Sequence, residues 1–352
     1  MQKKFLVVAA IILLVTTFQY CTKKTDAAAT TTVTTSAGLS LTLPSTPYNY
    51  SNVTYPAHIA NFLPTVDNTP ATNRITDDGA TLGRVLFYDK HLSQTNTVSC
   101  ASCHNPALDF NDTAKLSVGF SGRPTARNSM PLLNVRFYAS GKMFWDERAN
   151  TLEEQVLQPI QNTTEMGMTL ASLESSVSAQ DYYPALFQKA FGSAQVTSDR
   201  ISKALSQFVR SIITYQSKYD RVKQSLETFT AAEQQGENLF LNAAAPVTCA
   251  SCHRPPMFLT SNPAGPFALP DPTDHGINNQ NRFKVGSLRN IANAKNLFHN
   301  GSVPDVFSML NSNIPAHGVA PQDRAPILAF LQTLTDNTVS AEPKFSNPFT
   351  FK

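Results

Sequence analysis

The pentapeptide Cys-Ala-Ser-Cys-His occurs twice in this 352-residue chain, at Cys100–His104 and at Cys249–His253. Cys-x-x-Cys-His is the attachment sequence for haem c, in which both thiols bond to the porphyrin and the adjacent His ligates the iron. The bare Cys-x-x-Cys spacing also occurs in disulfides, zinc knuckles and thioredoxin-like dithiols. Two identical copies, each followed directly by His, favour two covalently bound haem c groups. The fold must therefore enclose two large planar cofactors.

The first 21 residues have the pattern of a secretory signal sequence. Lys3 and Lys4 precede an apolar run over residues 5–15, which is too short to span a bilayer. Cys21 then stands where a bacterial lipoprotein carries its lipid, although bulky residues precede it. Either Cys21 is acylated, or cleavage a few residues later releases a soluble protein. Both alternatives predict the periplasm, and the other four cysteines all belong to the haem motifs.

Composition divides the rest of the chain. Residues 22–45 are rich in Thr, Ala and Ser, so we expect a low-complexity tether there. The remaining length suffices for two domains. We expect an N-terminal haem domain over residues 46–225 and a C-terminal haem domain over residues 226–340. A net charge of +3, with 15% charged residues, does not indicate a nucleic-acid-binding surface.

The internal repeat extends upstream of the two motifs. Gly-x-x-Leu-Phe occurs at residues 83–87 and again at residues 236–240, which predicts a short helix before each haem site. Apolar residues at helical spacing predict further helices over residues 200–218 and 325–334, and another begins near Thr151. We find no period-2 run typical of a strand. The predicted fold class is all-α, with two tandem cytochrome c-type haem domains and long loops.

The chain between residues 79 and 336 resembles the bacterial di-haem cytochrome c peroxidases and the related MauG proteins. The resemblance rests on ordered sequence marks, namely Arg127-Asn128, Phe144-Trp145-Asp146-x-Arg148, Gln155, Pro159-Ile160, Glu165-Met166-Gly167, Phe283, Ser287-Leu288-Arg289-Asn290 and Phe298-His299-x-Gly301. It implies that the haem on Cys100, Cys103 and His104 is the peroxide site. It also implies that the haem on Cys249, Cys252 and His253 receives electrons.

The same resemblance assigns roles to three side chains. Trp145, the single Trp of the chain, matches a residue that lies between the two haems and shortens the electron path. Glu165 and Gln155 match the distal pocket. A carboxylate in an apolar pocket can take a proton from one peroxide oxygen and return it to the other. Gln155 would hydrogen-bond the bound peroxide.

Iron and calcium ligands are predicted less directly. Phe120 stands where the reductively activated peroxidases carry a ligating His, so we expect a five-coordinate or water-bound N-terminal haem. The sixth ligand of the C-terminal haem is Met309 or, as the runner-up, His317. His299 is expected to support that haem without ligating its iron. Asn128 matches a ligand of the family's calcium site, so calcium is a further expected cofactor.

Three functions compete on the sequence. The first is a peroxidase that reduces hydrogen peroxide with electrons from a small c-type cytochrome or cupredoxin. The second is a MauG-like oxidase of an organic or protein substrate; the lack of any Tyr after Tyr219 removes its closest version, which needs a Tyr haem ligand. The third is a plain electron carrier, which would gain nothing from a distal Glu and Gln. A homodimer is compatible with the resemblance and is not tested by the sequence.

Overall fold

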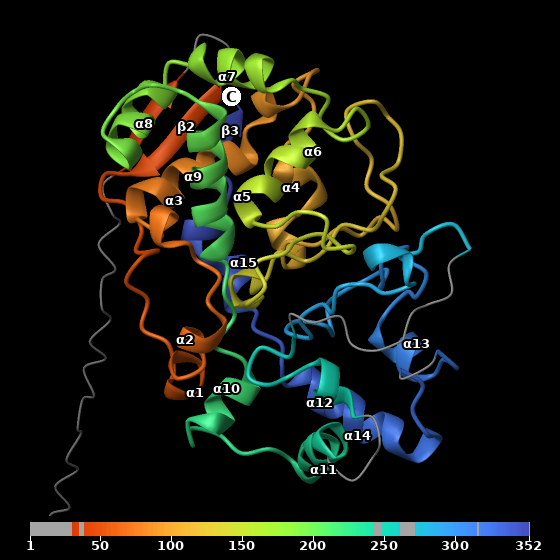
Figure 1. Ribbon diagram of the computed structural model, residues 1–352. Helices are drawn as coiled ribbons and strands as arrows, with labels where there is room; N and C mark the ends of the chain where they lie inside the picture. Colours follow the sequence, from red (N-terminus) through yellow and green to blue (C-terminus); the bar gives the residue numbers. More distant parts are fainter. Residues whose placement is uncertain (1–29, 35–38, 243–247, 261–271, 315–316, 352) are drawn as a thin grey trace, which may run out of the picture.

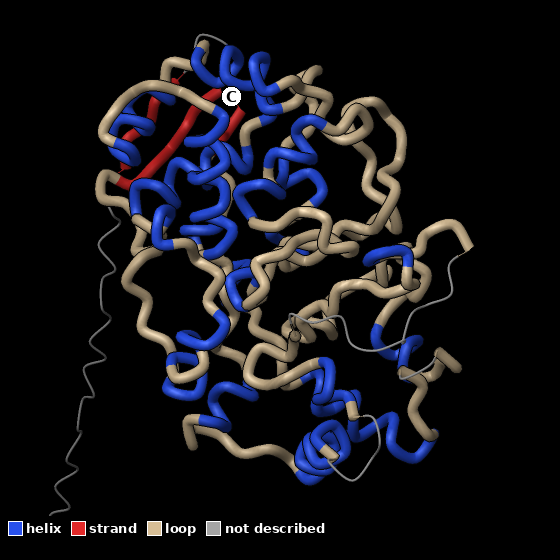
Figure 2. Tube along the Cα trace, viewed as in Figure 1, coloured by secondary structure: helices blue, strands red, loops and turns tan. Residues whose placement is uncertain are grey.

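The structure is a computed structural model that describes residues 30–34, 39–242, 248–260, 272–314 and 317–351. It is mostly helical with long connecting loops (Figure 2). The α-helices are α1 (Ala57–Ala60), α2 (Leu63–Val66), α3 (Asp77–Tyr88), α4 (Cys100–Cys103), α5 (Leu152–Gln155), α6 (Leu157–Gln161), α7 (Leu170–Ser178), α8 (Tyr183–Phe191), α9 (Ser198–Arg210), α10 (Lys218–Lys223), α11 (Ala231–Leu241), α12 (Cys249–Cys252), α13 (Val306–Leu310), α14 (Pro321–Gln332) and α15 (Thr338–Ala341). Single 3-10 turns join several of them.

Two hydrophobic cores organise these helices, one in the upper and one in the lower part of Figure 1. The first core centres on α3, α8 and α9. The second lies around α11, α12 and α14, and includes Phe240, Phe258 and Phe330. The second core begins at Tyr219, close to the predicted domain boundary, although Met257, Leu259 and the segment from Val339 onward pack in the first core. The exact haem-domain limits stay a prediction.

The repeated Gly-x-x-Leu-Phe sequence forms the same helix crossing in both cores. A Cβ added at Gly83 would lie 2.0 Å from the carbonyl oxygen of Ala204 in α9. A Cβ at Gly236 would lie 2.0 Å from the carbonyl oxygen of Pro326 in α14. Glycine is therefore required by the close approach of two helix backbones. The crossing places α3 and α11 against the short haem-motif helices α4 and α12.

A small antiparallel sheet corrects two predictions. β1 (Thr30–Thr34), β2 (Leu39–Pro44) and β3 (Phe349–Phe351) pair in the order β1-β2-β3. The all-α prediction was wrong in this respect, and so was the tether over the part of residues 22–45 that forms strands. Leu41 of β2 and Phe349 of β3 are both buried in the first core. The apolar residues of β2 can therefore be buried because the C-terminal end of the chain pairs with β2 as a third strand. Cys21 and the signal sequence lie outside the described residues.

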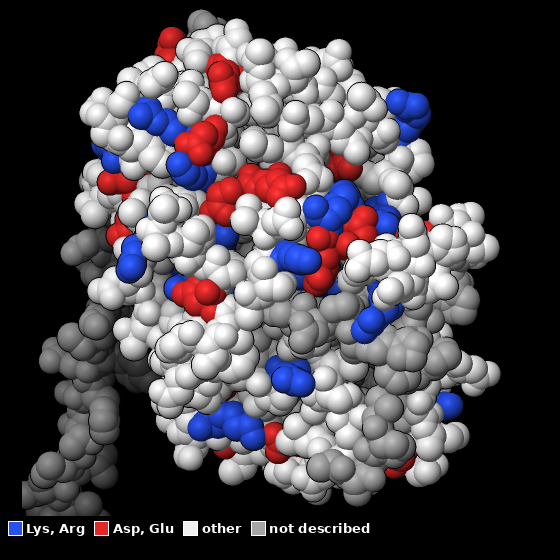
Figure 3. All heavy atoms as spheres, viewed as in Figure 1, with Lys and Arg blue, Asp and Glu red and all other residues white. Residues whose placement is uncertain are grey.

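Polar contacts join the two parts of the molecule. Arg127 bridges Asp146 and Asp274 at 2.6 Å each, and the backbone N–H of Lys284 donates to the carbonyl of Trp145 at 2.8 Å. Acidic and basic side chains are interspersed on the face seen in Figure 3, several of them in a band between the two parts. In the part of the chain described, no helix combines the length and apolarity needed to cross a membrane.

Candidate functional site

Each haem motif forms one short helix that local capping begins. Before α4, Ser99 and Ser102 make a reciprocal capping box, in which the Ser99 backbone N–H donates to the Ser102 hydroxyl at 3.0 Å. Before α12, the Thr248 hydroxyl accepts from the Ser251 backbone N–H at 3.1 Å. The helical turn brings the two Cys side chains of each motif onto one side and ends at the His. None of the four motif thiols is in a disulfide.

Both motif histidines are held ready to ligate a metal. Burial lowers the pKa of His104 and of His253 to about 4, so each ring is neutral at neutral pH. The Nδ1 atom of His253 lies 3.1 Å from the carbonyl oxygen of Gly286 and 3.3 Å from that of Phe258, and His104 Nδ1 lies 3.4 Å from the Phe110 carbonyl. An N–H at Nδ1 donates to these carbonyls and leaves Nε2 free to bind iron.

A cavity of about 210 Å³ opens beside the second motif. Its lining includes Cys249, Cys252 and His253 together with apolar side chains such as Phe240 and Leu331. Two thiols, a neutral imidazole and an apolar wall are the set that haem c needs. Within the described residues, neither motif lies in a group of three or more Cys, His, Asp or Glu side chains able to hold a metal ion.

Both candidates for the sixth ligand face this cavity. Met309, from α13, and His317, from the loop before α14, are part of its lining. The charge of His317 contributes to the lowered pKa of His253, second to burial, so the two rings are near one another. The choice between Met309 and His317 stays a prediction. His299 also lines the cavity, and its ring stacks on Phe283 with centroids 3.6 Å apart.

Trp145 lies in the wall between the two parts of the molecule. Its indole N–H donates to the carbonyl of Asn128 at 2.8 Å, and its carbonyl accepts from Lys284. Trp145 and Asn128 both line the cavity of the second motif, although both come from the part of the chain that carries the first. The tryptophan predicted between the haems therefore borders at least one of the two cofactor sites.

Glu165 lies near the first motif. Burial raises the pKa of its carboxyl group, and the charge of Arg148 opposes that rise. Burial also raises the pKa of the Cys103 thiol to about 11, and the charges of Asp112 and Glu165 add smaller contributions in the same direction. The role of Glu165 at the N-terminal haem stays a prediction.

The loop around Phe120 covers the turn that carries Glu165. The Phe120 backbone N–H donates to the Glu165 carbonyl at 2.9 Å. A Cβ at Gly167 would lie 2.4 Å from the Phe120 ring, so that ring packs directly against the turn. Phe120 therefore contacts the turn that carries Glu165, and the open coordination of the N-terminal haem stays a prediction. Gln155 ends α5, whose N-cap is Thr151, and it is half-buried there.

The predicted calcium site is not supported by an acidic cluster in the described residues. Asn128 is buried, and its side-chain N–H donates to the carbonyl of Lys115 at 2.9 Å. Ala294 and Asn296 line the same cavity as Asn128, with the cationic Lys295 between them. Calcium binding stays a prediction.

Sequence reasoning missed Lys284. Its side chain is 1% exposed, and its ammonium lies 3.8 Å from the centroid of the Tyr138 ring and 2.6 Å from the carbonyl of Lys142. Burial lowers the pKa of Lys284 to about 8. The available signal was a Lys directly between two apolar residues, Phe283 and Val285.

Comparisons with known proteins agree with this geometry. Residues 77–228 match the model of the family described as di-haem cytochrome c peroxidase. A cytochrome c551 peroxidase of Nitrosomonas europaea is 32% identical over 289 residues, which cover 77% of this chain and 83% of that protein. The methylamine utilization protein MauG of Methylorubrum extorquens is 31% identical over 293 residues, covering 75% of this chain and 80% of that protein.

A solved structure extends the likeness to the fold. It is that of a MauG-like protein associated with microbial copper homeostasis, with a TM-score of 0.72 and 28% identity. The match covers 86% of this chain and 99% of the other. With two haem-attachment motifs, two matching helix crossings and these relatives, the chain belongs to the di-haem cytochrome c peroxidase and MauG family.

Proposed function

We propose that this protein is a peroxidase that reduces hydrogen peroxide to two molecules of water, using two electrons and two protons. The observation that carries the proposal is Glu165, a carboxyl group whose pKa is raised by burial and whose charge acts on the Cys103 thiol of the first haem motif. An electron carrier has no use for such a proton carrier beside its cofactor. The haem would supply an iron that binds peroxide and passes electrons to it.

Glu165 moves the proton in this proposal. Its carboxylate accepts the proton of the peroxide oxygen nearer to the haem and returns it to the farther oxygen, which leaves as water. Gln155 holds the peroxide by a hydrogen bond. Burial keeps the pKa of Glu165 raised, which favours both steps because a proton is exchanged most easily by a group whose pKa is near the working pH.

The Phe120 loop keeps the N-terminal site open. A phenylalanine has no atom that ligates iron, and its ring packs against Gly167. The site would then need no prior reduction to expel a ligand. Trp145, hydrogen-bonded to Asn128 at the cavity wall of the second motif, would carry electrons from the C-terminal haem.

The partners and the location follow from the same proposal. A small c-type cytochrome or cupredoxin would donate electrons to the C-terminal haem. Haem c attachment and the signal pattern support a periplasmic location, with lipid attachment at Cys21 as one of two outcomes. Calcium at Asn128 would join the two parts of the molecule, and the proposed assembly is a homodimer.

The first test is steady-state oxidation of reduced cytochrome c by hydrogen peroxide, with fully oxidised enzyme and no prior reduction. We expect turnover from the first seconds. A lag that only half-reduction removes would contradict the open site. No turnover under either condition would contradict the peroxidase.

Glu165→Gln tests the proton carrier. We expect turnover to fall by about 10²–10⁴, because general acid–base catalysis contributes a factor of this size. The absorption spectra of both haems should stay unchanged, since Glu165 is not an iron ligand. Exposed Glu154→Gln is the matched control, and it should keep wild-type turnover. Unchanged turnover in Glu165→Gln would remove the proposed role.

A MauG-like oxidase is the alternative, and the 31% identity to MauG favours it as the second candidate. In this function the substrate would be an organic molecule or a protein. Peroxide consumption that does not require reduced cytochrome c, but does require such a substrate, would favour it.

A further inference from the structure

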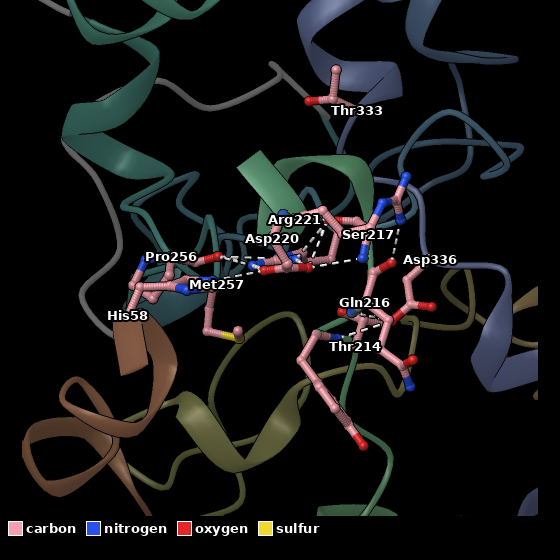
Figure 4. Close-up of polar contacts among 12 residues, drawn as sticks. His58, Thr214, Gln216, Ser217, Asp220, Arg221, Pro256, Met257, Thr333 and Asp336 are labelled. Atoms are coloured by element: carbon pink, nitrogen blue, oxygen red, sulfur yellow. Dashed lines mark hydrogen bonds and ion pairs between the residues drawn. The ribbon is translucent and has the colours of Figure 1, made fainter. Parts of the chain in front are cut away.

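An ion pair is fully buried between the two cores. The Arg289 and Asp220 side chains are both 0% exposed, and they form two hydrogen bonds of 2.6 and 2.9 Å. Ser217 donates to Asp220 at 2.7 Å, and His58 Nε2 lies 2.9 Å from it (Figure 4). Burial would raise the pKa of Asp220, but Arg289 and these neighbours hold it well below its usual range. The pair is therefore charged on both sides.

Burying such a pair is an inefficient way to stabilise a fold. The cost of removing two charges from water is comparable to their attraction, and apolar side chains of similar volume often stabilise as well. A buried ion pair has a clearer role where its remaining hydrogen-bond donors fix the position of a neighbouring backbone segment. Arg289 has donors beyond those that Asp220 uses.

Those donors reach the segment that follows the second haem motif. Arg289 Nε and Nη2 donate to the carbonyl of Pro256 at 3.0 and 2.6 Å. The hydroxyl of Ser287, two residues before Arg289, donates to the next carbonyl, that of Met257, at 2.7 Å. Consecutive carbonyls of this segment are thus held by two side chains of one short stretch. Pro256 and Met257 lie beside Asp220 in Figure 4.

The same two stretches hold His253. Its Nδ1 atom faces the carbonyl of Phe258, the residue after Met257, and that of Gly286, the residue before Ser287. The backbone N–H of Leu288 also donates to the Phe258 carbonyl at 3.1 Å. The Phe258 carbonyl therefore lies one and two residues after the carbonyls that Ser287 and Arg289 hold, and the Gly286 carbonyl directly precedes Ser287.

We propose that Arg289, held by Asp220, is a positioning residue for His253: it fixes the two backbone carbonyls that accept from the His253 ring and so sets the reduction potential of the C-terminal haem. This rests on His253 being the ligand of that haem. A hydrogen bond from the ring N–H increases the basicity of a ligating imidazole. A more basic ligand favours the oxidised iron, so loosening the carbonyls raises the potential.

The test is the double variant Asp220→Asn/Arg289→Met, which removes one charge of each sign and leaves the net charge unchanged. A redox titration followed by the haem absorption spectrum gives the potential of each haem. We expect the ratio of reduced to oxidised C-terminal haem to rise about tenfold at a given potential, a shift of about 59 mV for one electron. The N-terminal haem should not shift. An unchanged potential in the folded variant would overturn the proposal.

The chain offers a matched control. Arg210 and Glu153 form a similar two-bond pair in the first core, at 2.5 and 2.9 Å, with Arg210 only 1% exposed. The variant Glu153→Gln/Arg210→Met removes the same charges away from His253. We expect it to leave the C-terminal haem potential in place. An equal rise in this control would mean that the shift reflects general destabilisation, and would contradict the positioning role.

Ser287→Ala keeps the proposal testable should the double variant fail to fold. It removes one neutral hydrogen bond to the same segment, and we expect a smaller rise in the same direction. No change would overturn the proposal. His253→Ala separates the premise from the inference. If neither haem spectrum changes in it, the ligand assignment fails; if one changes while the other variants leave its potential unmoved, only the positioning role fails.

Discussion

Glu165 shows how one side chain takes its property from its surroundings. A Glu is ordinarily ionised well below neutral pH, and burial raises the pKa of Glu165 because an apolar environment disfavours the charged form. Arg148 opposes this, since its cation favours the carboxylate. Arg148 itself is 45% exposed, stacks on Phe144 and pairs with Asp146 at 2.9 Å. At the level of the sequence, Arg148 is only one of the residues that carry the family resemblance, and no role was predicted for this side chain.

The variant Arg148→Gln should move the acidic limit of turnover. As a base, Glu165 must be ionised, so activity falls as the pH drops through its pKa. Loss of the Arg148 cation raises that pKa further, and the acidic limb of the pH–rate profile should shift to higher pH. Exposed Arg123, whose guanidinium contacts Ser121, supplies the control Arg123→Gln. A profile that does not move, or moves to lower pH, would contradict the link between Arg148 and Glu165.

The sheet shows how an element can depend on a distant segment. β2 has β1 on one side and β3, from the last residues of the chain, on the other. Phe349 in β3 is 6% exposed and packs edge-on against Tyr182, with centroids 5.8 Å apart. Phe345, just before it, packs on Phe110 and Phe208 of the first core. The C-terminus is therefore part of the N-terminal core.

Phe349→Ala should lower the free energy of unfolding by about 3 kcal/mol, the usual cost of deleting a buried aromatic ring. Denaturant unfolding of the holoprotein, followed by circular dichroism, measures it. Leu226, which is 71% exposed, provides the control Leu226→Ala, expected within about 0.5 kcal/mol of wild type. Equal stability of the two variants would show that β3 does not contribute to the core.

Across the whole molecule, the two parts meet around buried polar groups. Lys284 and Trp145 share a backbone hydrogen bond there, and the Lys284 ammonium lies 3.5 Å from the Glu147 carboxylate. Burial lowers the pKa of Lys284 to about 8, with Glu147 opposing the shift. The ordinary value in an unfolded chain is about 10.4. Folding therefore binds fewer protons at Lys284 between these two pH values.

The free energy of unfolding should depend on pH because of this difference in proton binding at Lys284. Between pH 8 and 10.4 the unfolded state holds more protons at Lys284, so its contribution to the free energy of unfolding rises with pH. The rise should amount to about 3 kcal/mol, relative to a Lys284→Met variant in which the other titrating groups are unchanged. Measuring both proteins by denaturant unfolding at pH 7, 8, 9 and 10 tests this. A constant difference would contradict the lowered pKa.

Local patterns in the sequence were sufficient to predict the two haem-attachment motifs, the helix that precedes each of them, and the protein family. Cys-x-x-Cys-His and Gly-x-x-Leu-Phe act within a turn or two of helix, so their spacing can be read directly. Helix α9, expected over residues 200–218, ends at Arg210 because the chain then extends to reach Asp336 in the second part, whose carboxylate accepts from the Tyr215 and Gln216 backbone.

Only the tertiary structure determined the contacts between residues that are far apart in the chain. The pairing of β2 with β3 joins residues about 310 positions apart, and composition alone assigned β2 to a tether. The Asp220–Arg289 pair and the burial of Lys284 likewise depend on how the two cores meet. A pKa, a buried charge or a third strand is set by the neighbours that folding brings together, and those neighbours leave no periodic signal in the sequence.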